Sequence, residues 1–375
     1  MLEFILALFT VVSLVLTLWQ WLVASTFPIN ERTETTFSPP VSVLKPLKGC
    51  DLRTAECLRS WFEQDYPEAV QLLFGVDSPQ DPTCHLVREL IASYPKVDAK
   101  LIVCPESYGS NAKVSTLVQL QRLARHEVII ISDADVFAPR DLVQQVVQPL
   151  ADAWVGLVNC FYRLTNTSNF GMRWEAFAIN ADFWSQVLQA RSLQPVDFAM
   201  GAVMAQRKKQ IEAIGGFEAL ADYLADDYQI GNRIARSGGR IVISPVVVEC
   251  RSATVPWKDA WTHQKRWART IRVSQPIPYF LSKLSNATFW PLVWVVCDPG
   301  PRSYGFGALC LVVRMCSAFY CERKLTGRAR PSSLWMAPVK DLLQIAIWLM
   351  AFTGNRITWR GRDFRVQPNG KLVPL

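Results

Sequence analysis

The sequence predicts an α/β fold with a mostly parallel sheet flanked by helices, together with one apolar helix before it and further apolar segments after it. Three observations support this. Residues 4–30 carry no charged side chain, residues 39–274 alternate apolar β-rich runs with amphipathic helical runs, and apolar segments return beyond about residue 280. Strands that alternate with helical segments are typical of βαβ units and a parallel sheet.

The composition places the chain close to membrane proteins. Of its 375 residues, 50% are hydrophobic and 19% are charged, a lower charged fraction than ordinary soluble domains have. The net charge of +8 comes without a basic run, which argues against nucleic acid as a partner and favours anionic lipid or a phosphate-bearing ligand. The ten cysteines form no C-x-x-C pair, so we interpret them as reduced thiols in a domain that faces the cytosol.

Residues 1–30 are predicted to form an N-terminal transmembrane anchor. The uncharged stretch from Phe4 to Asn30 exceeds the length of about 20 residues that crosses a bilayer as a helix. It has neither a basic start nor an A-x-A cleavage site, so a cleaved signal peptide is the weaker interpretation. Trp19 and Trp21 suit the aromatic belt at a membrane surface.

Residues 39–275 are predicted to form the α/β domain. We expect strands in 41–47, 70–77, 99–104 and 127–135, and helices in 55–62, 83–93 and 113–124. The runs LLFGV and VIIIS are continuously apolar, as strands buried on both faces are. Open α/β sheets bind ligands at the carboxyl ends of their strands, so the acidic residues that follow these strands mark the candidate site.

Residues 280–356 are predicted to form membrane-associated helices. The three apolar segments there are short or interrupted, and Arg314 lies within the second. The sequence leaves open whether they span the bilayer, re-enter it or lie in its surface. Residues 357–375 are predicted to be a basic, aromatic tail suited to the lipid headgroups.

Acidic side chains recur where the predicted strands end. Asp77 ends the run LLFGVD, Asp133 and Asp135 form SDAD directly after VIIIS, and Asp226 and Asp227 lie in LADDYQIG. A D-x-D pair at a strand end is able to hold a hard divalent cation through oxygen ligands. A solvated turn is the simpler interpretation of any one such pair, because Asp is common in turns. The arrangement of all of them together carries more weight than any single member.

A second candidate group lies in the stretch HQKRW, on a predicted helix. Arg266 and Trp267 together offer a planar cation for phosphate and a flat face for a sugar or a lipid, and His263 lies one turn before them. The alternative interpretation is an amphipathic helix that lies on the membrane.

The order of these motifs resembles the D, D, D, (Q/R)xxRW signature of processive and lipid-acceptor glycosyltransferases. More narrowly, VSVLKPLKGCD, WFEQDYP, FGVDSPQDP, NAKVSTL and LADDYQIG resemble the ceramide glucosyltransferases, glycosyltransferase family 21. The hopanoid-type bacterial lipid glycosyltransferases are similar over the same stretches. His263 stands where ceramide glucosyltransferases usually have Gln or Arg, and a histidine there is more typical of the hopanoid-type relatives.

The resemblance implies a GT-A fold and an inverting transfer of a hexose from a UDP-sugar to the hydroxyl of a membrane lipid, with UDP-glucose and ceramide as the first expectation. Asp77, Asp133 and Lys113 would then bind the donor, although a surface position is the simpler interpretation of Lys113. Asp133 and Asp135 would hold Mg²⁺ or Mn²⁺, and Asp227 would act as the general base.

The same resemblance assigns His263, Arg266 and Trp267 to the diphosphate and the acceptor headgroup, and Gly201 to the lining of the acceptor site. Because sugar nucleotides are cytosolic, we expect an integral membrane protein whose catalytic domain faces the cytosol. Three alternatives stay open. They are a hopanoid or other bacterial lipid glycosyltransferase, for example one that transfers N-acetylglucosamine, a processive polysaccharide synthase, and a membrane protein that binds lipid or nucleotide without turnover.

Overall fold

The computed structural model describes residues 1–328, 330–359 and 361–375, which form two compact units built from segments far apart in the sequence. Unit 1 comprises Met1–Phe27, Thr167–Gln194 and Thr254–Asn369. Unit 2 comprises Pro28–Asn166, Pro195–Ala253 and Gly370–Leu375. Arg360, in the predicted basic tail, lies outside the described residues.

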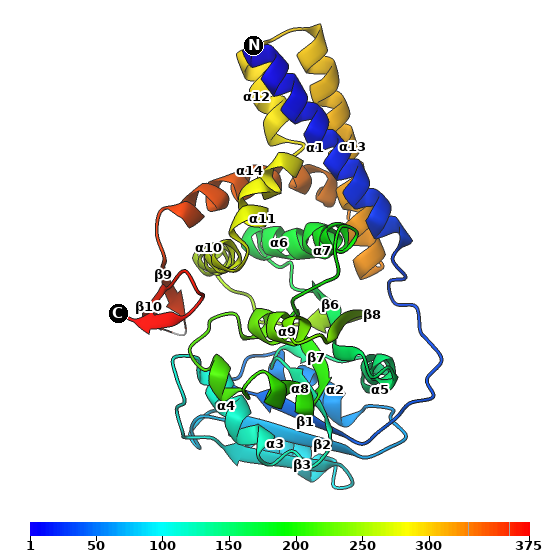
Figure 1. Cartoon of the computed structure of the whole chain (residues 1–375), viewed down its shortest axis with the longest axis vertical. Helices are drawn as coiled ribbons and strands as arrows, with labels where there is room; N and C mark the ends of the chain where they lie inside the picture. The colour runs from blue at the N-terminus through cyan, green and yellow to red at the C-terminus, as the bar shows by residue number, and fades with distance from the viewer. Residues whose placement is uncertain (329, 360) are drawn as a thin grey trace. The chain divides into compact units, whose positions relative to one another are not determined.

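An eight-stranded mixed sheet runs through unit 2 (Figure 1). Its strands are β1 (Val41–Pro46), β2 (Val70–Val76), β3 (Asp98–Val103), β4 (Val128–Ser132), β5 (Val136–Phe137), β6 (Val155–Leu164), β7 (Val203–Arg207) and β8 (Arg240–Cys250). They are arranged in the order β3-β2-β1-β4-β7-β6-β8-β5. The first four in this order are parallel, β7 is antiparallel to both β4 and β6, and β6 is parallel to β8. The predicted α/β fold with a mostly parallel sheet is therefore confirmed.

The central strands are buried on both faces, as the continuously apolar runs LLFGV and VIIIS predict for β2 and β4. All six residues of β1 are buried, with Val41 and Val43 in one hydrophobic core and Leu44 in the other. In β4 the same alternation places Ile130 in the first core and Ile131 in the second. Successive side chains of a strand point to opposite faces, so the sheet separates two cores and both need a helical cover.

Helices cover both faces of this sheet. The first core takes its helical residues from α2 (Thr54–Phe62), α3 (Thr83–Ser93), α5 (Leu142–Val147) and the 3₁₀ turn η1 (Gln148–Ala151). The second takes them from α4 (Ala112–Gln121), α8 (Lys208–Ala213), the 3₁₀ turn η3 (Glu218–Leu220) and α9 (Asp226–Arg236). The helices expected in 55–62, 83–93 and 113–124 correspond to α2, α3 and α4. Unit 2 also contains the short strand β11 (Leu372–Pro374).

Unit 1 is mainly helical. Its elements are α1 (Leu2–Thr26), α6 (Phe170–Phe177), the π-helical segment η2 (Ala178–Phe183), α7 (Trp184–Arg191), α10 (Trp257–Ser274), α11 (Pro276–Leu281), the 3₁₀ turn η4 (Ser282–Ser285), α12 (Phe289–Cys297), α13 (Pro301–Thr326), α14 (Ser332–Phe352) and the antiparallel strands β9 (Arg356–Trp359) and β10 (Arg362–Val366). Helices α1, α12 and α13 pack together as a bundle, and α14 lies across the foot of that bundle (Figure 1).

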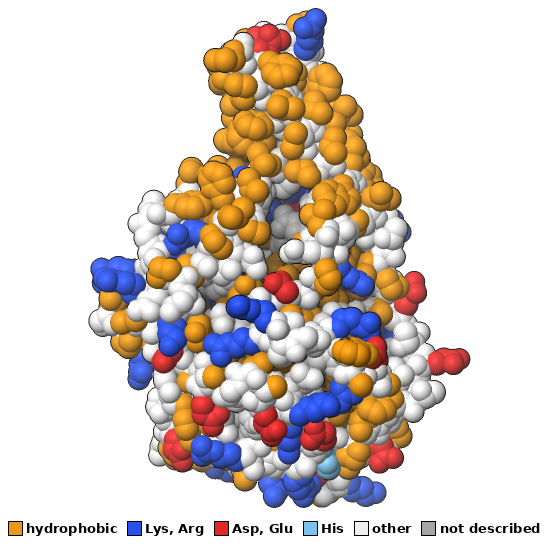
Figure 2. Space-filling view, viewed as in Figure 1, with side chains coloured by type: hydrophobic (Ala, Val, Ile, Leu, Met, Phe, Trp, Pro, Cys, Tyr) orange, Lys and Arg blue, Asp and Glu red, His pale blue; other side chains and the backbone are white. Residues whose placement is uncertain are grey.

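Among the described residues, three helices are long and apolar enough to cross a membrane: α1, α13 and α14. The side-chain distribution of helix α1 is the reverse of that in a surface helix of a soluble protein. Its polar side chains are buried, and many of its apolar side chains are exposed. Its buried polar residues are Thr10, Ser13, Thr17 and Gln20, and its exposed apolar residues include Leu8, Val11, Val15, Leu18 and Leu22. Figure 2 shows the resulting apolar surface over the bundle. A surface of this kind suits lipid as its surroundings.

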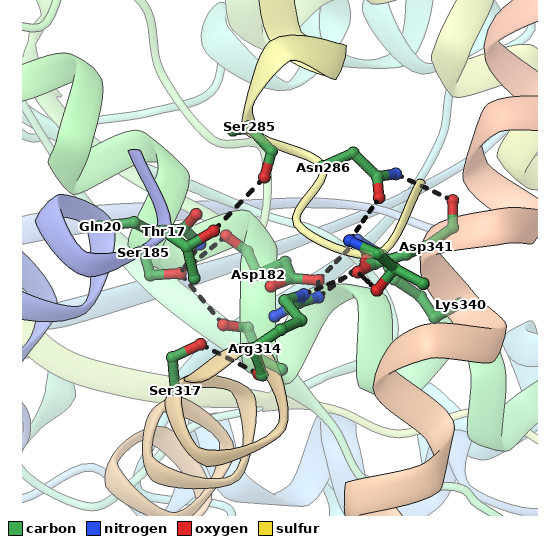
Figure 3. A network of polar contacts seen from close by, with 12 residues as sticks. Thr17, Gln20, Asp182, Ser185, Ser285, Asn286, Arg314, Ser317, Lys340 and Asp341 are labelled. Atoms are coloured by element: carbon green, nitrogen blue, oxygen red, sulfur yellow. Dashed lines mark hydrogen bonds and ion pairs between the residues drawn. The ribbon is translucent and has the colours of Figure 1, made fainter. Parts of the chain in front are cut away.

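The charge that interrupts α13 is neutralised inside unit 1 (Figure 3). Arg314 donates from Nε to Asp341 Oδ2 of α14 at 2.8 Å and from Nη2 to Asp182 Oδ2 of η2 at 2.7 Å. Lys340 Nζ lies 2.5 Å from the same Asp182 oxygen. Two cations and two carboxylates therefore balance one another, and α13 continues unbroken through Arg314 because the guanidinium has buried partners.

Candidate active site

The D-x-D motif lies in the turn between β4 and β5, at the carboxyl end of a parallel strand. The Asp133 N–H donates to the carbonyl of Ala202, next to β7, at 3.2 Å. The Asp135 carbonyl accepts from the Arg251 N–H, just after β8, at 2.9 Å. The turn is thus hydrogen-bonded next to β7, the neighbour of β4, and next to β8, the neighbour of β5. These contacts fix the backbone from which the two carboxylates project.

Asp77 lies at the end of β2, and β1 separates β2 from β4 in the sheet. Its carboxylate is partly exposed, and Oδ2 lies 2.7 Å from Lys48 Nζ. Asp77 therefore occupies the same edge of the parallel strands as the D-x-D motif, although no direct contact joins them among the described residues. This edge is where open α/β sheets bind their ligands.

Lys113, in the first turn of α4, connects the acidic motifs. Its Nζ lies 2.7 Å from Asp133 Oδ1 and 3.1 Å from Asp226 Oδ2, and its side chain is only 12% exposed. Burial opposes the charge of this ammonium, but the carboxylates of Asp133, Asp226 and Asp227 outweigh burial and hold the pKa of Lys113 above its usual value. The structure places this lysine inside the acidic group, which rules out the surface position.

The start of α4 is itself fixed by a side chain, and this fixes Lys113. Asn111 caps the helix by accepting from the Val114 N–H at 3.2 Å. Its amide donates to the Tyr223 carbonyl at 2.8 Å and to Asp226 Oδ1 at 3.4 Å. One asparagine therefore ties the beginning of α4 to the segment that leads into α9.

Asp227 lies in the first turn of α9, beside Asp226. Burial, followed by the charge of Asp226, raises the pKa of Asp227 to about 6. A Cβ atom at Gly201 would lie 2.9 Å from Asp227 Oδ2, so a larger residue at this position would displace the carboxylate from where it lies. A partly buried carboxyl whose pKa lies near neutrality is suited to accepting a proton.

The D-x-D carboxylates fit a divalent cation that also binds phosphate oxygens of the substrate. Burial, and after it the charge of Asp133, raises the pKa of Asp135 to about 6. Among the described residues, no side chain donates a hydrogen bond to the Asp135 carboxylate. These are hard oxygen ligands of the kind that Mg²⁺ and Mn²⁺ take. Within the described part of the chain, no group of three or more His, Cys, Asp or Glu side chains could hold a metal ion. A metal bound here would therefore need oxygen atoms from the substrate as well.

The motif HQKRW lies in unit 1, on α10. His263 Nδ1 is 2.5 Å from Glu175 Oε1 of α6, and the His263 ring packs edge-on against Trp267 with 5.0 Å between centroids. Trp267 also lies 6.2 Å from the ring of Phe183 in η2. Lys113, Asp133, Asp135, Gly201 and Asp227 thus belong to unit 2, whereas His263, Arg266 and Trp267 belong to unit 1.

The family model for glycosyl transferase family 21 matches residues 3–372 of this chain. The chain belongs to this family. The recognition made from the motifs is therefore confirmed at the level of the family, and the chain is a family 21 glycosyltransferase.

Curated relatives of this family 21 glycosyltransferase are ceramide glucosyltransferases. Ceramide glucosyltransferase 3 of Caenorhabditis elegans is 23% identical over 349 residues, which cover 90% of this chain and 74% of the relative. Ceramide glucosyltransferase 1 of the same organism is 26% identical over 232 residues, which cover 62% of this chain and 49% of the relative. The match to the second relative spans about half of that protein's length.

A solved structure similar to the family 21 chain is that of a mannosyltransferase from Pyrobaculum calidifontis in complex with GDP-Man and Mn²⁺. It has a TM-score of 0.59 and 22% sequence identity, and the match covers 92% of this chain and 99% of the mannosyltransferase. The likeness confirms the predicted GT-A-like fold.

Two charged residues next to the predicted site residues of this glycosyltransferase were not predicted from the sequence. Lys45 of β1 is buried over the Trp61 ring, and its Nζ donates to the Asp133 carbonyl at 2.7 Å. Burial lowers the pKa of Lys45 to about 7, although Asp133 opposes this. The second residue is Glu175 of α6, whose carboxylate contacts His263. The available signal was a charge within a largely apolar stretch. Lys45 is the single charge in VSVLKPL, and Glu175 shares FGMRWEAF with Arg173.

Proposed function

We propose that this chain is an inverting membrane glycosyltransferase that moves a hexose from a UDP-sugar to the hydroxyl of a membrane lipid, with UDP-glucose and ceramide as donor and acceptor. The observation that carries the proposal is the Lys113 ion pair with Asp133 and Asp226, which gathers the D-x-D motif and the start of α9 around one buried cation. Membership in family 21 and the ceramide glucosyltransferase relatives support the choice of substrates.

In the proposed reaction, Asp227 accepts the proton of the lipid hydroxyl as its oxygen attacks the anomeric carbon. The bond between that carbon and the diphosphate breaks on the opposite face, and its electron pair leaves with the UDP oxygen, which inverts the configuration. The raised pKa of Asp227 suits it to this task. Gly201 keeps the carboxylate free to approach the acceptor, since a larger residue would press on it.

The leaving diphosphate needs positive charge around it, because one further negative charge develops on its oxygen as UDP departs. Lys113 supplies one such charge, and Asp77 is proposed to contact the uridine part. Asp133 and Asp135 would hold Mg²⁺ or Mn²⁺, which supplies electrostatic stabilisation of the diphosphate when bound. For His263, Arg266 and Trp267 we propose contacts with the diphosphate and the acceptor headgroup, as the motif implies.

The membrane arrangement is also part of the proposal. Residues 1–30 would anchor the chain, residues 39–275 would carry the catalysis, residues 280–356 would contact the membrane, and residues 357–375 would lie at the headgroups. Three helices are long and apolar enough to span, which supports an integral membrane protein. We propose that the catalytic domain faces the cytosol, because the sugar nucleotide is supplied there.

A second acceptor class is supported by one residue. His263 stands at the motif position where a histidine is typical of the hopanoid-type lipid glycosyltransferases. Transfer of N-acetylglucosamine or another hexose to a hopanoid or other bacterial lipid is therefore the alternative candidate function.

The deciding experiment incubates membranes that contain the chain with labelled UDP-glucose, UDP-galactose, UDP-glucuronic acid or UDP-N-acetylglucosamine, with ceramide or a hopanoid added as acceptor. Mass spectrometry of the extracted lipid then identifies the product. We expect labelled glucosylceramide, and a hopanoid glycoside would select the second candidate. Asp227→Asn should lower transfer by at least about 100-fold while UDP still binds. A soluble labelled polymer, or UDP binding without any labelled lipid, would show the proposal to be wrong.

A further inference from the structure

Glu175 holds the first residue of the HQKRW motif through a buried contact. Its side chain in α6 is 8% exposed, and the single oxygen Oε1 contacts two consecutive residues of α10. His263 Nδ1 lies 2.5 Å from this oxygen, and the Gln264 amide donates to it at 3.1 Å. Gln264 in turn accepts from the Gln344 amide of α14 at 3.4 Å. Three helices of unit 1 therefore meet around one carboxylate.

The environment of Glu175 makes this carboxylate costly to bury. Its neighbour Trp174 packs with Trp257 and Trp261 at ring-centroid distances of 5.1 and 5.7 Å, and among the described residues no lysine or arginine forms an ion pair with Glu175. A buried carboxylate without a cationic partner depends on strong hydrogen bonds to offset its lost hydration. His263 and Gln264 provide these bonds, so the carboxylate and the motif helix are matched to each other.

The contact decides which ring nitrogen of His263 carries a proton. A carboxylate oxygen only accepts, so at 2.5 Å the Nδ1 atom must be the N–H that donates. The other ring nitrogen, Nε2, is then the atom left for a ligand, and no described protein atom is hydrogen-bonded to it. The ring also packs against Trp267, so its orientation affects the motif's tryptophan as well.

We propose that Glu175 is a positioning residue for glycosyl transfer. It holds His263 as the Nδ1–H form and directs Nε2 and the Trp267 ring toward the substrate, and this inference rests on the proposed function of the HQKRW motif. Glu175 itself touches no substrate in this assignment. A purely structural role would require the carboxylate only for packing α6 against α10, and would not depend on the identity of the residue at position 263.

The first test is the spectroscopic signature of the imidazole. The chain has only three histidines, so the NMR spectrum of the ¹⁵N-histidine-labelled protein in nanodiscs contains signals from three imidazole rings. The signal that disappears in H263Q is that of His263. We expect the Nδ1–H pattern in the wild-type protein and its loss or mixing in E175Q. The matched control is E89Q, which removes the carboxylate of the exposed His85–Glu89 pair, 3.5 Å apart, and should leave the His263 signal unchanged. A wild-type His263 protonated only at Nε2 would overturn the proposal.

The second test is a double-mutant cycle on lipid glycosylation. E175Q should lower kcat/KM by roughly 10- to 100-fold in the wild-type background, as loss of a charge-assisted hydrogen bond predicts. In an H263A background the same change should have little effect, because the group that Glu175 positions is already absent. A loss of folding in E175Q would lower activity in both backgrounds, so the cycle separates positioning from stability.

The outcomes also separate this inference from the proposed function. If Asp227→Asn abolishes transfer while E175Q retains it fully, the proposed function stands and the role of Glu175 is refuted. If the wild-type chain transfers no sugar to any lipid, the proposed function fails, and with it the positioning role of Glu175 in that reaction. An equal loss from E175Q in both backgrounds would show that Glu175 acts through stability alone.

Discussion

Lys113 and Asp133 lie on different elements of unit 2, yet Lys113 Nζ is 2.7 Å from Asp133 Oδ1. The lysine is in the first turn of α4, whereas the aspartate directly follows β4. The same ammonium lies 3.1 Å from Asp226 Oδ2 at the start of α9. One buried cation therefore keeps two acidic motifs, more than 90 residues apart in the sequence, at one place in the fold.

Removing the charge of Lys113 should impair donor binding and change the pKa of the proposed base, Asp227. We expect K113M to lower kcat/KM for the UDP-sugar by about 10- to 1,000-fold, because preorganised positive charge at the diphosphate is lost. Loss of the nearby cation should also raise the pKa of Asp227 further and move the acid limb of the pH profile to higher pH. K100M, which changes an exposed lysine of the edge strand β3, is the control. An unchanged pH profile in K113M would contradict the coupling.

Transfer should fall in acid because the proposed base becomes protonated. The pKa of Asp227 is raised to about 6, so the fraction able to accept a proton declines as the pH falls through this value. Below it, kcat/KM should drop by about tenfold per pH unit. The measurement is the initial rate from pH 4.5 to 8 at saturating metal and donor. A rate that stays constant down to pH 4.5 would mean that Asp227 is not the group that titrates.

Removal of the divalent cation should abolish donor binding through the D-x-D motif. We expect EDTA to suppress transfer and Mg²⁺ or Mn²⁺ to restore it in the wild-type protein, whereas D135A should not recover. Calorimetric titration with UDP in the presence and absence of Mn²⁺ measures the same effect without turnover. D152A, which breaks an exposed ion pair with Arg240 and a hydrogen bond from the Trp154 N–H, should bind UDP and Mn²⁺ as wild type does. Full activity of D135A in EDTA would refute the metal assignment.

The buried ion network of unit 1 should dominate the stability of its helices. R314M leaves the carboxylates of Asp182 and Asp341 without the guanidinium that pairs with both, at a cost of about 3–5 kcal/mol in the free energy of unfolding. Thermal denaturation in detergent measures this loss. R323M, on the exposed side of the same helix, is the matched control and should melt close to wild type. Equal melting temperatures for the two variants would show that the network contributes little.

Local patterns were sufficient to predict much of unit 2. The helix expected in 83–93 coincides with α3, and the continuously apolar runs around Leu73 and Ile130 are strands buried on both faces. Such predictions succeed because burial on both faces favours apolar residues at successive positions of a strand. The position of the D-x-D motif at a strand end follows from the same reasoning.

Other features depend on partners that are distant in the sequence. Glu175 and His263 are 88 residues apart and belong to two helices, so neither local sequence indicates the other. Arg314 interrupts an apolar segment, which left the number of spanning helices open in the sequence. The structure resolves the interruption by placing Asp182 and Asp341 against the guanidinium.

By itself the sequence determined the order of the strands and helices in residues 41–135, the acidic motifs at the strand ends and the resemblance to family 21, since all of these are patterns of neighbouring residues. Only the tertiary structure decided that Lys113 is buried between two acidic motifs and that Glu175 sets the proton on His263. Ion pairs and tautomers depend on which atoms meet within about 3 Å, and that is decided by how distant segments pack.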